Sequence, residues 1–368
     1  MGVFTGYRDS PHTECGIVTT LGIQFLQRSM RKPSRLSEVA KLAGVAPITA
    51  SRAIRGIGYV SEDARARIMD AATQLNYAPD MVARRMRGEK SRLIGIFVNN
   101  FGSLALHEIT REISNEARSR GYDIVLFNAE RFDGPDRAGT RDMLANLCAG
   151  LILPMPNVED GYLAELEQRQ LPCVFVNFEA RPTKLPVVVV ENRKGARLAV
   201  EHLLSLGHRR IAFIAGSHHT GQSGERQAAY VETLNAAGIA VDAALIVSGR
   251  FVQSGGYAAT QQLLALSDPP TAIFAANDEM AFGAIDAIHS KGLRVPGDIS
   301  VVGFDDIAIS SHIHPPLTTM RQPLSELSAC AVRELMALIE GQGPEAKKVA
   351  LPLELIVRKS TGLVPQRG

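Results

Sequence analysis

The sequence predicts a small helical domain followed by a larger α/β body with parallel sheets. Residues 34–80 contain three short helical patterns, and from Leu93 onward short apolar runs alternate with amphipathic helices. Alternating strands and helices are typical of parallel sheets that carry helices on both faces. Because residues 92–368 are too many for one compact sheet of this kind, we expect the body to have two lobes.

Three short helices are expected in the small domain. The first covers residues 36–42 and stops at Gly44, where the chain must turn tightly. Pro47 suits the first position of the second helix, because its missing N–H would have no partner there. That helix ends at Gly56, and the hydroxyl of Ser61 can cap the third.

Nine apolar runs in the body are expected to form strands. Each is short enough for a buried strand and is followed by a turn or a helical pattern. In chain order they are LIGIFV, DIVLF, GLILP, CVFV, VVVV, RIAFIAG, ALIV, AIFAA and ISVVG. Examples of the helices predicted between them cover residues 106–120, 195–206 and 280–291.

Charge is distributed unevenly along the chain. The formal net charge is +2, but the segment from Arg31 to Arg92 holds 13 Lys and Arg against 6 Asp and Glu, a net of +7. From Leu93 to Gly368 there are 25 basic against 30 acidic side chains, a net of −5. A basic head on a mildly acidic body indicates a polyanionic partner for the head alone.

The first two helices of the small domain meet at an AGVAP turn, in the pattern of a helix-turn-helix. Ala43-Gly44-Val45 supplies the small and apolar residues that such a turn needs. Thr49, Ser51 and Arg52 supply polar side chains on the second helix. The spacing alone equally fits a corner between two helices of any helical domain. The charge of +7 favours DNA binding.

Amide and acid side chains follow four of the predicted strands. They are Asn99-Asn100, Asn177, Asn277-Asp278 and Asp305-Asp306. Ligands of doubly wound sheets bind outside the carboxyl ends of the strands, and amides together with carboxylates suit a polyhydroxylated ligand. Asn and Asp also begin ordinary turns, which would account for Asn99 and Asp306. The repetition at four strand ends favours a binding site.

The sequence gives no positive sign of catalysis. It has no GxSxG elbow, no GxxxxGK[ST] phosphate loop and no dinucleotide-binding loop. His218-His219 and the pair His312 and His314 lack a carboxylate or cysteine at zinc-site spacing, and we interpret them as solvated loop residues. The 4 cysteines lie too far apart in sequence to suggest a zinc site or a disulfide framework. We therefore expect no enzymatic activity, no metal and no cofactor.

Residues 36–60, LSEVAKLAGVAPITASRAIRGIGYV, resemble the DNA-binding domain of the lactose-repressor (LacI) family of bacterial transcription regulators. The similarity extends from Met30 to Gly362. The resemblance implies a two-lobed body similar to periplasmic sugar-binding proteins, with the chain crossing between lobes near residues 190, 322 and 350. The further stretches that carry it are NYAPDMVARRMRGEKSRLIG, GHRRIAFIAG, FAANDEMAFGAI, RVPGDISVVGFDD, PPLTTMRQP and IVRKST.

The residues and the resemblance together predict how the chain is divided. The scattered pattern of residues 1–33 predicts a flexible N-terminal extension, with a mis-assigned start over residues 1–29 as the alternative. The parts that follow are a helix-turn-helix DNA-binding domain (34–80), a hinge helix (81–91) and an effector-binding and dimerisation domain (92–368). In that last domain, one lobe would comprise residues 92–190 and 323–350, and the other 191–322 and 351–368.

In this family the second helix of the head enters the major groove of DNA. The resemblance therefore implies that three residues face the bases in the major groove: Pro47, Ile48 and Arg52. Arg52 can read a guanine edge or grip a phosphate, whereas Pro47 and Ile48 have no hydrogen-bonding side chain and can only pack on thymine methyls. Thr49 and Ser51 are the better candidates for phosphate contacts.

Residues 81–91 match the family's hinge helix, which folds where two subunits meet over the minor groove. Met86 holds the position of the apolar wedge that enters the central base step. Ala83 is small enough for the two helices to approach closely. Without DNA, the segment would be a charged linker. The basic side chains that would neutralise phosphates are Arg84, Arg85 and Arg87.

The resemblance also assigns effector contacts in the body. Arg226 matches an arginine that holds hydroxyls or a carboxylate, and Phe251 matches an aromatic residue that stacks on a sugar ring. The remaining candidates, with Asn100 and Ser103 the weaker, are Asn100, Ser103, Asn177, Asn277 and Asp305.

We therefore expect a cytoplasmic, nucleoid-associated homodimer that binds palindromic operator DNA and represses carbohydrate-utilisation genes under the control of a sugar or sugar-acid effector. The effector could be an inducer or a co-repressor. No apolar run reaches the roughly 18 residues of a membrane span, and we see no signal peptide. The alternatives are a sugar-binding receptor that does not read DNA, which the basic head disfavours, and a sugar-modifying enzyme, which lacks a catalytic set.

Overall fold

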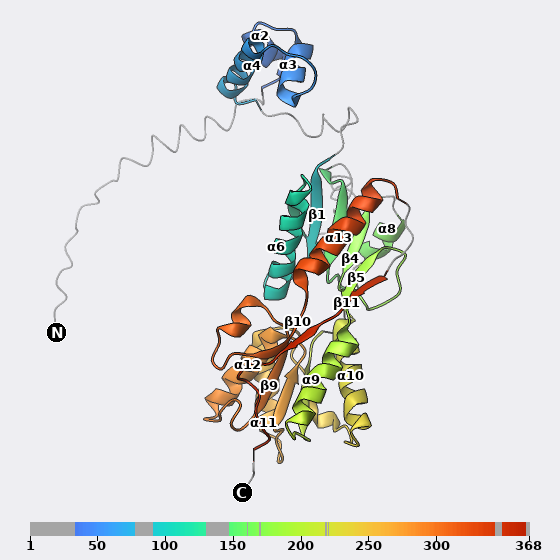
Figure 1. Cartoon of the computed structure of the whole chain (residues 1–368), viewed down its shortest axis with the longest axis vertical. Helices are drawn as coiled ribbons and strands as arrows, with labels where there is room; N and C mark the ends of the chain where they lie inside the picture. The colour runs from blue at the N-terminus through green and yellow to red at the C-terminus, as the bar shows by residue number, and fades with distance from the viewer. Residues whose placement is uncertain are drawn as a thin grey trace, which may run out of the picture. The chain divides into compact units, whose positions relative to one another are not determined.

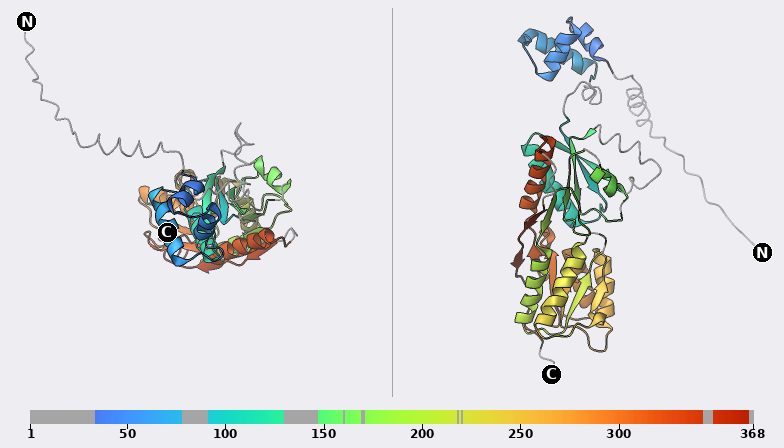
Figure 2. Two further views of the ribbon diagram at one scale, coloured as in Figure 1. Left: turned by 90° about the horizontal axis from the view of Figure 1, so that it is seen from above. Right: turned by 90° about the vertical axis from the view of Figure 1, so that its right-hand side faces the viewer.

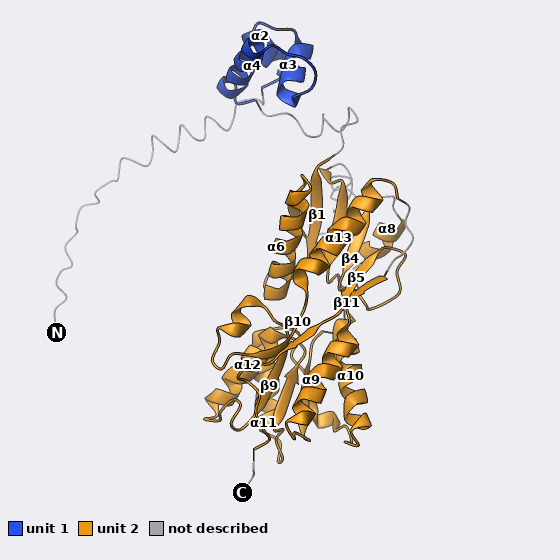
Figure 3. Cartoon of the chain, in the orientation of Figure 1, with its two compact units in different colours: residues 1–89 blue, residues 90–368 orange. Residues whose placement is uncertain are grey.

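The computed structural model describes residues 34–77, 91–129, 147–159, 161–168, 171–217, 219, 221–342 and 348–365. The chain divides into two compact units, residues 1–89 and 90–368, which have different colours in Figure 3. The predicted N-terminal extension lies outside the described residues, and so do the predicted hinge contacts at Ala83, Arg84, Arg85, Met86 and Arg87.

The described part of the first unit folds into three short helices. They are α2 (Leu36–Leu42), α3 (Pro47–Arg55) and α4 (Glu62–Gln74). Val39, Ala50 and Ile68 contribute one fully buried apolar side chain from each helix to a small core. Gly44 and Gly56 have φ angles of 66° and 67°. Because this left-handed region favours glycine, the turn and the end of α3 fall where the two glycines predict them.

The described part of the second unit contains two six-stranded sheets, one in each lobe (Figure 1). The strands are β1 (Leu93–Val98), β2 (Asp123–Asn128), β3 (Gly150–Pro154), β4 (Cys173–Val176), β5 (Val187–Val190), β6 (Ile211–Ala215), β7 (Ile246–Ser248), β8 (Ala272–Ala275), β9 (Ser300–Asp305), β10 (Thr318–Arg321), β11 (Lys348–Leu351) and β12 (Glu354–Ile356). The first sheet has the order β11-β5-β4-β3-β1-β2 and is parallel throughout. The second has the order β12-β10-β9-β8-β6-β7, in which β12 alone is antiparallel to its neighbour.

Helices flank both sheets. They are α6 (Leu104–Ser119), α8 (Tyr162–Gln168), α9 (Asn192–Ser205), α10 (Gln222–Ala236), α11 (Gln253–Leu264), α12 (Asp278–Ser290) and α13 (Leu324–Ile339), with short 3-10 helices η3 (Ala243–Leu245) and η4 (Ala308–Ser311). In the first lobe α6 packs beside α13, and in the second α9 packs beside α10 and α11 beside α12 (Figure 1). The right-hand view of Figure 2 shows the two lobes one above the other.

The chain passes between the two lobes three times. The passages join β5 to α9, β10 to α13 and β11 to β12. Each lobe is therefore assembled from segments that are far apart in the sequence. A small change of backbone angles in these short connections can change the angle between the lobes, as in hinge motions of other two-lobed proteins.

The structure differs from the sequence predictions in a few elements. Strands β10, β11 and β12 fall outside the nine predicted runs, because β11 and β12 are short edge strands and β10 reads TTMR. The ALIV run begins in η3, and β7 starts two residues into the run. Helices α6, α9 and α12 begin two or three residues earlier than predicted. For α6 and α12 the cause is a cap, since Ser103 and Asn277 accept hydrogen bonds from the N–H groups of Leu106 and Met280.

Two glycines allow α11 and α12 to pack with their backbones in contact. A Cβ on Gly256 would lie 2.2 Å from the Met280 carbonyl oxygen, and one on Gly283 would lie 2.0 Å from the Gln253 carbonyl oxygen. Real Cβ atoms are not found so close to backbone oxygens. The helix pair behind the second sheet therefore depends on both glycines.

We expect Gly283→Ala to lower the free energy of unfolding of the body by about 1–3 kcal/mol, because the methyl group must push two backbones apart. Gly224→Ala is the matched control: Gly224 lies in α10 with open space around its Cα, and alanine there should stabilise by about 0.5–1 kcal/mol. Urea unfolding followed by circular dichroism measures both. Equal effects of the two substitutions would contradict the close packing.

Candidate functional site

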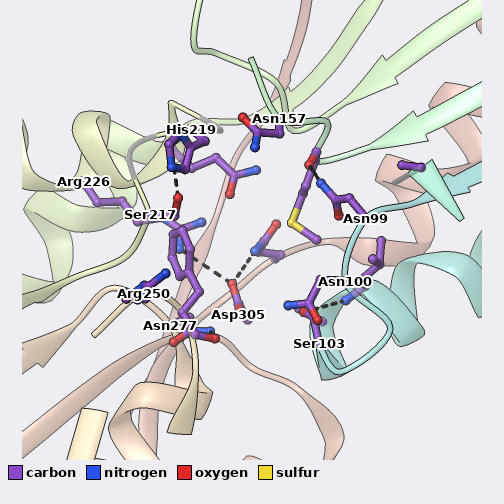
Figure 4. Close-up of a pocket in the computed structure, with 17 residues that line it drawn as sticks. Asn99, Asn100, Ser103, Asn157, Ser217, His219, Arg226, Arg250, Asn277 and Asp305 are labelled. Atoms are coloured by element: carbon purple, nitrogen blue, oxygen red, sulfur yellow. Dashed lines mark hydrogen bonds and ion pairs between the residues drawn. The ribbon is translucent and has the colours of Figure 1, made fainter. Parts of the chain in front are cut away.

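A cavity of about 310 Å³ lies between the two lobes of the second unit. Figure 4 shows Asn99, Asn100 and Ser103 on one side and Ser217, His219 and Arg226 on the other. Most of its polar side chains stand at or just beyond the carboxyl ends of strands, where doubly wound sheets bind ligands. The lining residues are Asn99, Asn100, Ser103, Ala105, Leu106, Ala129, Met155, Asn157, Ser217, His219, Gln222, Arg226, Arg250, Phe251, Asn277, Asp305 and Gln322.

Arg226, on α10, is a buried cation at the wall of this cavity. Its Nε donates to Asn192 Oδ1 at 2.9 Å, and its Nη1 donates to the carbonyl oxygen of Ala276. The guanidinium carbon stands 3.6 Å from the centre of the Phe304 ring. Burial lowers its pKa to about 10, opposed by the nearby Asp305. The guanidinium therefore remains charged at neutral pH. Its two hydrogen bonds and the Phe304 ring fix the orientation of its plane.

Asp305 ends β9 and faces both Arg226 and Gln322. Its Oδ1 is 3.8 Å from Arg226 Nη1 and accepts a hydrogen bond from Gln322 Nε2 at 2.5 Å. Burial raises the pKa of the Asp305 carboxyl to about 8, although Arg226 opposes this shift. The backbone at Asp305 has a φ of 128°. Near neutral pH, the carboxyl group can accept hydrogen bonds from the hydroxyls of a ligand when it is ionised, and can donate one when it is protonated.

Asn177 is the predicted effector contact that the structure does not place on the cavity wall. It is 1% exposed and lies behind the lining residues. Its Nδ2 donates to Gln322 Oε1 at 3.1 Å, and its carbonyl oxygen accepts from Gln222 Nε2 at 2.6 Å. The Asn177 side chain therefore holds Gln322 in place, and its backbone carbonyl holds Gln222.

Asn277 and Phe251 both line the cavity, and each is fixed by its neighbours. Asn277 Oδ1 caps α12 by accepting from Met280 N at 3.0 Å, and its Nδ2 lies 3.4 Å from the Phe251 carbonyl oxygen. The Phe251 ring lies directly against Gly216, where a Cβ would meet it at 2.1 Å. The ring is partly buried. Asn277 therefore has less hydrogen-bonding capacity for a ligand than its residue type suggests.

Strained backbone gathers around the cavity. Seven non-glycine residues in the described part of the chain have a positive φ. Such conformations cost about 1–3 kcal/mol each, persist only where the surrounding structure enforces them, and are common at ligand sites. Those that line the cavity are Met155, Arg250, Phe251 and Asp305.

Several lining residues were not among the sequence predictions. Asn99, which we assigned to an ordinary turn, lines the cavity while its Nδ2 donates to the Met155 carbonyl at 2.8 Å. His219 is exposed, as a solvated loop residue should be, but it also lines the cavity, and its Nδ1 is 3.2 Å from Glu159 Oε1 in the other lobe. Both follow strands, which was the available signal. Nothing in the sequence indicated that Arg250 would turn toward the cavity.

Direct contacts join the lobes beside the cavity. Glu279 Oε1, at the start of α12, accepts from Leu104 N at 2.9 Å at the start of α6. Glu108 Oε1, on α6, accepts from Ala308 N at 2.7 Å. Burial raises the pKa of Glu279. These carboxylates bridge the lobes directly and so stabilise one relative orientation of them.

Helix α3 carries the predicted DNA contacts of the head. Pro47, Ile48 and Arg52 are exposed, and Thr49 and Ser51 are partly exposed. Its N-cap, Ala46, makes no side-chain hydrogen bond to the helix. No cluster of three or more potential metal ligands occurs among the described residues, and none of the helices they form is long and apolar enough to cross a membrane.

A helix-turn-helix head and a two-lobed body with a polar cavity between its lobes define a class: ligand-controlled, DNA-binding transcription regulators. The family model for bacterial regulatory proteins of the lacI family matches residues 35–80. The model for a periplasmic binding protein-like domain matches residues 200–361.

Relatives cover nearly the whole chain. The lactose operon repressor of Escherichia coli (strain K12) is 35% identical over 336 residues, 90% of this chain and 91% of that protein. The probable HTH-type transcriptional repressor ExuR of Bacillus subtilis (strain 168) is 32% identical over 330 residues, 88% of this chain and 97% of that protein. The chain belongs to the lacI family of bacterial regulatory proteins, which confirms the resemblance and excludes an enzyme.

Solved structures agree with the predicted fold class. The lac repressor dimer bound to operator and the anti-inducer ONPF has a TM-score of 0.77 at 33% identity, covering 90% of this chain and 100% of that one. A transcriptional regulator CelR–cellobiose complex has a TM-score of 0.68 at 30% identity, covering 89% and 99%. The predicted head and parallel-sheet body are therefore confirmed.

The raised pKa of Asp305 predicts that the affinity for a neutral polyol depends on pH. Ligand hydroxyls that donate to the carboxylate favour its ionised form, so affinity should increase as pH rises through the pKa of about 8. Between pH 7 and 9 we expect the Kd of a bound sugar to fall about tenfold, and the Kd for Asp305→Asn to stay flat. Isothermal titration calorimetry at several pH values tests this. The same pH profile in both proteins would contradict the assignment.

Proposed function

We propose that this protein represses carbohydrate-utilisation genes, and that a sugar or sugar acid bound between the lobes controls its hold on palindromic operator DNA. The observation that carries the proposal is the polar cavity beside the connections between the lobes, in a chain that also has a helix-turn-helix head. The names of the relatives, a lactose operon repressor and a CelR–cellobiose complex, support a carbohydrate effector. The protein acts as a cytoplasmic, nucleoid-associated homodimer.

The proposed division of labour follows the predicted boundaries. Residues 34–80 read DNA and residues 81–91 form the hinge helix. Residues 92–368 bind the effector and the second subunit. Met86 and the arginines beside it remain the proposed minor-groove contacts of the hinge.

At the DNA, the exposed side of α3 is proposed to enter the major groove. Arg52 is its strongest base-reading group, since a guanidinium can bond both acceptors of a guanine. Ile48 is 63% exposed in the free head, an arrangement that suits contact with thymine methyl groups. Pro47 packs beside it, and Thr49 and Ser51 donate to phosphates.

At the effector, Arg226 and Asp305 are proposed to hold adjacent hydroxyls, because a guanidinium donates in pairs and a carboxylate accepts in pairs. Phe251 covers the apolar face of the ring. Asn100, Ser103 and Asn277 complete the set from the two sides of the cavity (Figure 4). Asn177 acts indirectly, through Gln222 and Gln322.

Control of DNA binding is proposed to be a population shift between two lobe orientations. A ligand shifts such an equilibrium only by its difference in affinity for the two states. Gln322 lies just after β10, at a connection between the lobes, and bonds Asp305 on one side and Asn177 on the other. A ligand that bonds Asp305 therefore changes the contacts of a connecting residue, and in the dimer this sets whether two hinge helices can order on DNA.

The first test is the DNA contact of α3. We expect Arg52→Ala to weaken binding to the operator by about 1–3 kcal/mol, roughly 5- to 150-fold in Kd, because a bidentate base contact is lost. The operator is located by footprinting the DNA that flanks the protein's own gene, and Kd is measured by fluorescence anisotropy.

Arg209→Ala is the matched control, because Arg209 is an exposed arginine of the body. It should leave operator affinity unchanged. A wild-type protein that showed no salt-sensitive binding to any flanking palindrome would instead favour the receptor that does not read DNA.

A further inference from the structure

The cavity carries more positive than negative charge, and one of its cations has no partner among the described residues. Among the described lining residues, Arg226, Arg250 and His219 are basic, and Asp305 is the one carboxylate. Arg226 already donates to Asn192 and Ala276 and faces Asp305. The side chain of Arg250 makes no hydrogen bond or ion pair with the described residues.

The fold holds Arg250 at the cavity by means of a tight loop. Gly249 N donates to the Ala215 carbonyl at 2.8 Å, and Val252 N donates to the Gly249 carbonyl at 3.2 Å. A Cβ on Gly255 would lie 2.0 Å from the Gly249 carbonyl oxygen, so this loop has no room to shift. Arg250 itself has a φ of 58°. A non-glycine residue adopts this angle at a free-energy cost, so the surrounding packing must enforce it. The backbone position of Arg250 is therefore fixed.

Most other described arginines of the same lobe form an ion pair, the exposed Arg209 being an exception. Arg193 bonds Glu225, Arg210 bonds Asp242, and Arg294 bonds Asp298. An unpaired guanidinium that lines a cavity beside hydroxyl-binding groups is suited to a carboxylate or phosphate, which it can bind through two parallel N–H···O bonds.

We propose that the effector is an anionic sugar derivative, of about monosaccharide size, whose acid group is bound by Arg250 while its hydroxyls face Arg226, Asp305 and Gln222. This rests on the proposed function and specifies its ligand class. The size follows from the cavity volume of about 310 Å³, at the small end of the roughly 300–1,000 Å³ of small-molecule sites.

The experiment compares matched neutral and anionic sugars on the full chain. The probes are glucose with glucuronate, gluconate and glucose 6-phosphate, and galactose with galacturonate. Thermal shift identifies binders, and calorimetry gives Kd. At least one acid should bind ten times more tightly than its neutral counterpart, and its affinity should fall as NaCl rises from 50 to 500 mM. Whether a carboxylate or the phosphate gives the larger preference identifies the acid group.

Substitutions at Arg250 then test the assigned contact. Arg250→Gln should reduce the preference for the acid over the neutral sugar at least tenfold, and Arg250→Glu should reverse it. Arg250→Lys should retain part of the preference, because lysine keeps the positive charge but cannot make two parallel hydrogen bonds to the acid group. Arg209→Gln is the control and should retain all of it. Thermal unfolding of each free variant verifies that it is folded.

Three results would overturn the proposal: neutral sugars that bind as tightly as their acids, a preference that survives Arg250→Gln, or no binding of any probe by protein that binds its operator. Each of these leaves the proposed regulator intact. The proposed function would fail if the protein did not bind operator DNA, regardless of which sugars it binds.

Discussion

The buried hydrogen bonds from Asp305 to Gln322 and from Gln322 to Asn177 are the constraint on which the rest of the body depends. They join the end of a strand in one lobe, a connection between the lobes, and a turn in the other lobe. A buried polar group left without a partner costs about 1–3 kcal/mol, so the lobes cannot change orientation without keeping or replacing these bonds. A ligand that bonds Asp305 competes with Gln322 for the Asp305 carboxyl group. Its binding therefore changes the contacts of a residue that connects the two lobes.

The contacts beside the cavity explain why such a change can be two-state. The carboxylates of Glu279 and Glu108 accept backbone N–H groups from the opposite lobe, and each bond is made in one orientation and lost in another. Helices α11 and α12 pack through Gly256 and Gly283 too closely to deform gradually. A rigid-body motion of the lobes would concentrate the energy of rearrangement in a small number of polar contacts.

Sequence alone predicted the architecture and the edge of the sheet where the site lies, because apolar periodicity and strand-end amides are local signals. It could not predict which side chains turn into the cavity. Asn177 has the expected residue type, yet its amide faces Gln322. Arg250 lies beside the predicted contact Phe251, but its own orientation depends on how Gly249 and Gly255 pack. His219 is a solvated loop histidine, and the sequence does not show that the fold also places it at the cavity near Glu159 of the other lobe.

Under the proposed control, effector and operator act on one equilibrium of the lobes. Thermodynamic reciprocity makes this measurable: if the effector changes operator affinity by some factor, operator must change effector affinity by the same factor, typically 5- to 150-fold. The direct measurement is the Kd of the bound sugar, determined by calorimetry for the free protein and for the protein saturated with operator. We expect the ratio of these two Kd values to equal the effector's effect on operator Kd. An effector Kd unchanged by operator would show that the two ligands do not share an equilibrium.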